Sequence, residues 1–138
     1  MTTAAAKNKY GKLYANDIAL LLSAEKGLKP SAVFDFISVS KLPPDRIEKL
    51  LGRTIKTFTN YKNKAIQLDP ATSEKLLKLF SLYEKGIEVF GTIDGFNNWM
   101  LKPAFGLGGQ VPEVLTSTIT GIGLVEEEVL RIAYGNLA

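Results

Sequence analysis

Glycine and proline residues divide this chain into short segments, and each segment carries apolar residues at helical spacing. Gly27, Gly52 and Gly91 each follow such a segment, whereas Pro44 and Pro70 each precede one. Proline fits the first turn of an α-helix because its missing N–H would be unpaired there, and glycine ends a helix because it tolerates positive φ. The pattern predicts an all-α fold.

The longest predicted helix runs from Asp69, its expected N-cap, to Gly91, with Leu76, Phe80 and Tyr83 along one side. Four shorter helices are expected to begin at the caps Asn16 and Thr54 and near Pro30 and Pro44. Three more are expected over residues 94–101, 112–117 and 125–134. Residues 116–120 are rich in β-branched side chains and keep a strand as an alternative.

The composition argues against an enzyme. The 138 residues include no cysteine and no histidine, which removes disulfides, thiolate nucleophiles, the usual zinc sites and the commonest general base. The acidic residues offer no pair suited to carboxylate catalysis. We therefore expect no catalytic residue, no metal and no cofactor. The longest apolar run, residues 18–22, is far shorter than the roughly 20 residues that span a bilayer, so we expect a cytoplasmic protein with no membrane contact.

Charge is distributed unevenly. Residues 1–68 hold 12 basic and five acidic residues, whereas residues 69–138 hold five basic and nine acidic ones. Such asymmetry is typical of a protein whose basic part meets nucleic acid, although a basic half can also be a solvated surface.

Residues 43–64 have the layout of a helix-turn-helix, with Gly52 in the turn and a basic second helix. Lysine neutralises phosphate and asparagine can hydrogen-bond to adenine. The polar and basic side chains of the turn and the second helix are therefore the candidate DNA-binding surface. Its members are Arg53, Thr54, Lys56, Thr57, Asn60, Asn63 and Lys64. Two packed helices with a solvated basic face remain the alternative. Glu48 and Arg53 stand where such units usually carry apolar residues, which indicates either a different turn packing or a partly degenerate motif.

A glycine-rich loop follows Trp99, the only tryptophan, and is bounded by Pro103 and Pro112. The run Gly106-Leu107-Gly108-Gly109 lacks the spacing of a phosphate-binding loop. Positive φ or close backbone approach at these glycines is the better explanation, and a rigid loop favours binding because it loses little entropy. Trp99 suits either a core or an interface. Arg131 compensates the helix dipole beside Glu127, with a second role possible.

Trp99, Pro103, the Leu107-Gly108-Gly109 run, Pro112 and the Leu130-Arg131-Ile132 run resemble the C-terminal toxin-binding domain of the Xre/MbcA/ParS antitoxin family. Upstream, residues 27–28, 50–52 and 56–58 are similar to that family's Xre-type helix-turn-helix domain. The residues before the Leu-Gly-Gly depart from the family, because such loops more commonly carry proline or alanine where this chain has Phe105-Gly106.

The resemblance implies an antitoxin that blocks the active site of a NAD-consuming toxin with the RES fold, and that represses its own operon as a homodimer within a larger complex. It implies a DNA-binding and dimerisation domain at 16–92 and a toxin-binding domain at 93–138. Residues 1–15 are small, polar and basic with little periodicity, so we expect a flexible basic arm there. The implied toxin contacts are Trp99, Pro103, Leu107, Gly108, Gly109, Pro112, Arg131, Tyr134, Gly135, Asn136, Leu137 and Ala138. A helix-turn-helix repressor without a toxin partner is the alternative.

Overall fold

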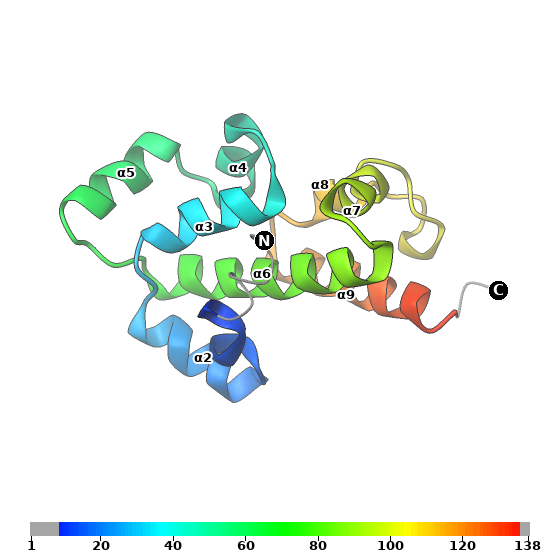
Figure 1. Cartoon of the computed structure of the whole chain (residues 1–138), viewed down its shortest axis with the longest axis horizontal. Helices are drawn as coiled ribbons and strands as arrows, with labels where there is room; N and C mark the ends of the chain where they lie inside the picture. Colours follow the sequence, from blue (N-terminus) through cyan, green and yellow to red (C-terminus); the bar gives the residue numbers. More distant parts are fainter. Residues whose placement is uncertain (1–8, 136–138) are drawn as a thin grey trace. The chain divides into compact units, whose positions relative to one another are not determined.

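The computed structural model describes residues 9–135, and Figure 1 shows that their ordered elements are helices. In chain order these are η1 (Gly11–Tyr14), α2 (Asp17–Lys26), α3 (Ser31–Ser40), α4 (Pro44–Leu51), α5 (Ile55–Asn63), α6 (Pro70–Phe90), α7 (Ile93–Met100), η2 (Phe105–Leu107), α8 (Pro112–Leu115) and α9 (Ile119–Ala133). Within residues 9–135 there is no strand, so the predicted all-α class is confirmed.

Polar side chains begin several of these helices as the sequence predicts. The side-chain oxygens of Asn16, Thr54 and Asp69 each accept the backbone N–H three residues later, at 2.9, 3.2 and 3.2 Å. Each bond pairs one of the N–H groups that a first helical turn leaves without an intrahelical partner. These caps explain why local sequence locates the starts of α2, α5 and α6.

The chain forms two compact units, Met1–Ser81 and Leu82–Ala138, and the boundary between them falls within α6. The first unit has a core of fully buried apolar side chains from α3, α4, α5 and α6. Its members include Val33, Phe36, Ile47, Phe58, Leu76, Leu77 and Leu79. Burial of this set supplies the main driving force for folding of the unit.

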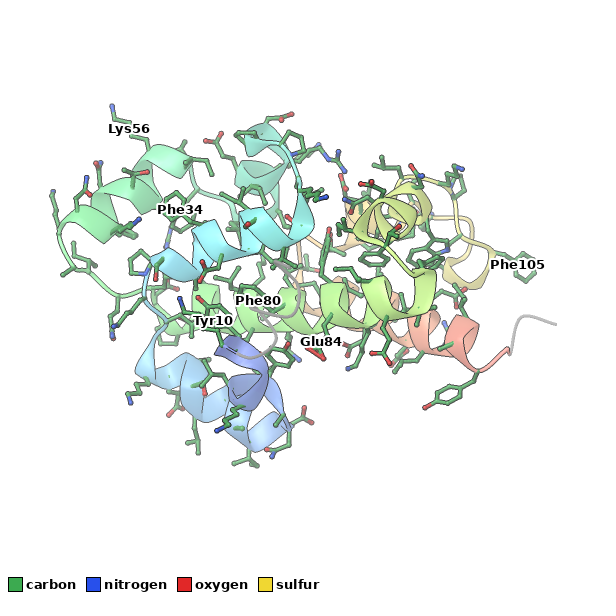
Figure 2. The ribbon with its side chains drawn as sticks, viewed as in Figure 1. Tyr10, Phe34, Lys56, Phe80, Glu84 and Phe105 are labelled. Carbon is green, nitrogen blue, oxygen red and sulfur yellow. The ribbon has the colours of Figure 1, made fainter. Side chains whose placement is uncertain are left out.

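Part of the expected basic arm packs into the first unit. The Tyr10 ring, only 5% exposed, stacks on Phe80 with centroids 4.4 Å apart, and its hydroxyl donates to Asp35 Oδ2 at 2.5 Å; Figure 2 shows the two rings together. Burial, followed by the hydrogen bond to Asp35, raises the pKa of Tyr10 above its usual range. Residues 9–14 therefore belong to the folded unit, and residues 1–8 lie outside the described residues.

The second unit is built around Phe96 of α7, which is fully buried together with Met100, Ile122, Val125 and Val129. The Phe96 ring packs edge-on against Tyr83, at 5.0 Å between centroids. It also lies directly on Gly86 of α6, where a Cβ would come within 2.5 Å of its ring carbons Cδ1 and Cε1. The missing side chain at Gly86 thus makes room for the central ring of this unit.

The last helix is longer than predicted, because α9 begins at Ile119 and not at Val125. Thr118 caps it by accepting the N–H of Gly121 at 3.0 Å. A Cβ at Gly121 would overlap the carbonyl oxygen of Leu115, so glycine is required there by close packing and does not end the helix. Of the β-branched residues 116–120, Thr116 caps the end of α8, and Thr118, Ile119 and Thr120 form the cap and the start of α9.

Two glycine-to-alanine substitutions should change stability in opposite directions. Gly123→Ala should raise the free energy of unfolding by up to about 1 kcal/mol, because Gly123 lies inside α9 with no atom near its would-be Cβ. Gly86→Ala should lower it by about 1–3 kcal/mol, because the new methyl group displaces the Phe96 ring. Urea denaturation measures both, and a stabilising Gly86→Ala would contradict the packing described here.

Candidate functional site

The turn between α4 and α5 carries the first candidate site. Gly52 ends α4 with φ of +73°, and its N–H donates to the carbonyl of Glu48 at 2.8 Å. Thr54 then caps α5, with its hydroxyl 3.0 Å from that of Thr57. Two short helices joined by three residues are the arrangement of a helix-turn-helix.

Glu48, which stands where an apolar residue is usual, makes a hydrogen bond that joins α4 to α5. Its Oε2 accepts the backbone N–H of Ile55 at 2.8 Å, across the turn from α4 to the first residue of α5. That N–H has no partner within α5, since it belongs to the first helical turn. This hydrogen bond gives Glu48 a structural role in joining α4 to α5.

Arg53 is held by the start of α6. Its Nη1 donates to Asp69 Oδ1 at 2.9 Å, and the Thr72 hydroxyl donates to the same oxygen at 2.6 Å. The hydrogen bond from Thr72 and then that from Arg53 outweigh the opposing effect of burial and lower the pKa of Asp69 from 3.8 to about 2. Arg53 therefore connects the turn to the start of α6. In the sequence analysis this residue was assigned only to the DNA-binding surface.

The remaining candidates gather on the outer side of α5. Lys56, Asn60, Asn63 and Lys64 are exposed, as is Thr54, whereas Thr57 is half-buried and Phe58 faces the core. Spacings of three and four residues place Lys56, Asn60 and Asn63 on one helix face, and Figure 2 shows Lys56 pointing away from the rest of the unit. Ammonium groups beside carboxamides can neutralise phosphate and hydrogen-bond base edges.

The second candidate site lies in the unit formed by residues 82–138. Trp99 packs on Phe90 and Phe96, with ring centroids 5.4 and 6.1 Å away, and it is half-buried. Pro112 starts α8 and is buried, Leu107 is half-buried, and Pro103 is exposed. The sequence-predicted residues thus divide between the core and the surface of this unit.

The glycine-rich loop is tightly folded. Gly108 and Gly109 have φ of +66° and +80°, which confirms the expected left-handed backbone. Ala104 exchanges hydrogen bonds across the loop, donating to the carbonyl of Gln110 and accepting the N–H of Gly109, both at 3.0 Å. The loop therefore has a defined shape before any partner binds.

A buried carboxylate joins this loop to α9. The Glu128 side chain is 2% exposed and accepts a hydrogen bond from Arg131 Nε at 2.8 Å. It also packs on Gly106 so closely that a Cβ there would overlap its oxygens. The expected pairing of Arg131 with Glu127 is thus replaced by Glu128, one position later in the chain. Sequence reasoning missed Glu128, although its spacing of three residues from Arg131 is as suitable for a helical ion pair as the spacing of four from Glu127; its burial under Gly106 has no local signal.

The end of α9 presents two further candidates at the surface. The Arg131 side chain is 42% exposed and Tyr134 is 78% exposed, and Gly135 follows with φ of +71°. Asn136, Leu137 and Ala138 lie outside the described residues.

Two other kinds of site are not found between residues 9 and 135. This part of the chain holds no group of three or more carboxylate-bearing side chains placed to bind a metal ion. None of its helices combines the length and apolar character that a membrane crossing requires.

Comparison with protein families matches each unit separately. The antitoxin Xre-like helix-turn-helix domain matches residues 19–81, and the antitoxin Xre/MbcA/ParS C-terminal toxin-binding domain matches residues 85–135. The chain belongs to the Xre-type antitoxins. Comparison with curated proteins found no match.

The family assigns a class of role to each surface of this Xre-type antitoxin. The α4–α5 pair lies within the matched helix-turn-helix domain, and the loop, α8 and α9 lie within the matched toxin-binding domain. Both domain families are typically non-enzymatic.

Replacing Glu48 tests the turn of the Xre-type antitoxin. Glu48→Ala should lower the free energy of unfolding by about 1 kcal/mol, because the N–H of Ile55 loses its acceptor. Glu25→Ala is the matched control, since Glu25 is an exposed carboxylate on α2. Urea denaturation of both variants provides the comparison, and equal small effects would show that the contact across the turn contributes nothing.

Proposed function

We propose that this antitoxin binds a NAD-consuming RES-domain toxin and blocks its active site, and that it represses its own operon through α5. The observation that carries the toxin part is the toxin-binding domain at residues 85–135, which ends in an exposed Arg131 and Tyr134. The RES partner itself is inferred from the resemblance of the Leu107-Gly108-Gly109 loop and the Leu130-Arg131-Ile132 run to the family.

The proposed blocking segment is residues 131–138. Arg131 supplies a positive charge for acidic features at the rim of the toxin's NAD pocket, and Tyr134 supplies an exposed aromatic ring. Occlusion of this kind needs no nucleophile or general base, which agrees with a chain that has no cysteine or histidine. The remaining proposed contacts, which include Trp99 of α7, Pro103 of the loop and Pro112 of α8, shape the domain or flank its surface.

The proposed operator contacts are the exposed side chains of α5 and its cap, from Thr54 to Lys64. Asn60 suits adenine in the major groove, and Lys56 and Lys64 suit phosphates. Arg53 acts mainly as a positioning residue, because Asp69 holds its guanidinium.

We also propose that the antitoxin is a homodimer within the toxin–antitoxin complex. Its support is a face of α2 on which Ile18, Leu21 and Leu22 are 67%, 49% and 63% exposed. Two α2 helices related by a two-fold axis perpendicular to them would bury these side chains and place the Asp17 end of each helix beside the Lys26 end of the other.

Truncation separates the proposed function from that of a repressor without a toxin partner. The product of the neighbouring reading frame should consume NAD. The full chain should stop this consumption, and a chain lacking residues 131–138 should not, while still binding operator DNA. NAD assays and gel shifts measure the two activities. A toxin unaffected by the full chain would favour the pure repressor, and inhibition by the truncated chain would remove residues 131–138 from the blocking role.

Substitution on α5 tests the operator surface. The double variant Lys56→Ala/Asn60→Ala should lower operator affinity at least about tenfold and weaken its salt dependence, because one base contact and one phosphate contact are lost. It should inhibit the toxin normally. Lys29→Ala/Asn98→Ala makes the same chemical changes at exposed positions outside α5 and should bind the operator like the unmodified chain. Unchanged affinity in the α5 variant would show that another surface reads the DNA.

A further inference from the structure

Phe105 is the most exposed large apolar side chain of the described residues. It is 94% exposed, compared with 78% for Tyr134 and 69% for Val114 in the same unit. Figure 2 shows its ring projecting from the loop away from the rest of the unit. A phenylalanine in this position adds almost nothing to the core, and its ring is available to a partner.

The loop fixes the backbone on both sides of Phe105. The carbonyl of Phe105 accepts the N–H of Gly108 at 3.2 Å, and Ala104, just before it, bonds to Gly109 and Gln110 at 3.0 Å. The ring is therefore carried on an ordered turn, and binding through it need not order a flexible segment. Aromatic side chains held in this way are favoured as centres of binding energy.

Glu128 places this loop against the last turns of α9. The residue after Phe105, Gly106, packs on the Glu128 carboxylate, which in turn holds Arg131 at 2.8 Å. The contacts from Gly106 to Glu128 to Arg131 connect the base of the exposed ring to a guanidinium that is itself 42% exposed. An apolar group and a cation are thus presented by neighbouring parts of one domain.

We propose that Phe105 is the aromatic anchor by which this antitoxin recognises its toxin. The ring enters an apolar pocket on the toxin surface, and an acidic group of the toxin beside that pocket meets Arg131. The inference rests on the proposed function. The toxin is favoured over a second copy of the chain as the occupant because Phe105 and Arg131 both lie within the matched toxin-binding domain, residues 85–135.

The test compares two exposed apolar residues of the same unit. Phe105→Ala should weaken binding of the proposed toxin, the product of the neighbouring reading frame, at least about 30-fold, the range of an interface hot spot. Val114→Ala, at a residue 69% exposed on α8, should change it less than about threefold. Titration calorimetry gives the affinities. Both variants should unfold at the temperature of the unmodified chain, because neither side chain is buried.

Three outcomes would overturn the inference, and they are distinguishable. If Phe105→Ala binds the toxin as the unmodified chain does, the anchor is wrong and the proposed function stands. If the unmodified chain itself fails to bind this toxin, both the proposed function and the role of Phe105 as an anchor are wrong. If light scattering without toxin shows that Phe105→Ala loses a dimer that Val114→Ala keeps, the ring is a contact between copies of the chain.

Discussion

Burial of aromatic rings against α6 is the constraint on which both units depend. Phe80 receives the rings of Tyr10 and Phe36, at 4.4 and 5.4 Å between centroids, in the first unit. Three residues later Tyr83 packs against Phe96, at 5.0 Å, in the second. Each α6 ring therefore organises the packing of one unit, and the surface elements are held by their attachment to these cores.

Much of the fold could be predicted because helix signals are local. Asn16, Thr54 and Asp69 cap helices through bonds to residues three positions later, a distance that sequence pattern captures directly. The start of α9 carries the same local signal, since Thr118 accepts the N–H of Gly121 three residues later, but the predicted helix begins at Val125, just before its acidic residues. Gly121 resembles a helix breaker in sequence, whereas its role depends on the carbonyl of Leu115 across a turn.

The candidate sites were predicted unevenly for a similar reason. The exposed row on α5 follows from helical periodicity, so the sequence could locate Lys56 and Asn60. Glu48 and Arg53 looked like defects because their partners, the N–H of Ile55 and the carboxylate of Asp69, lie seven and 16 residues away. Phe105 was overlooked because its significance is its exposure, which no periodic pattern in a loop indicates. The family resemblance supplied the toxin-binding role, and the structure supplied the positions of its side chains.

The pairing of Arg131 with Glu128 also limits how this arginine can meet another molecule. Its Nε–H is already engaged by a carboxylate that is 2% exposed. Pulling the guanidinium away would leave that buried carboxylate without its cation, at a cost of several kcal/mol. Only the two terminal amino groups can therefore be offered outward, in the fixed plane of the guanidinium. Arg131 therefore favours an acceptor that approaches its two terminal amino groups end-on over one that would surround the cation.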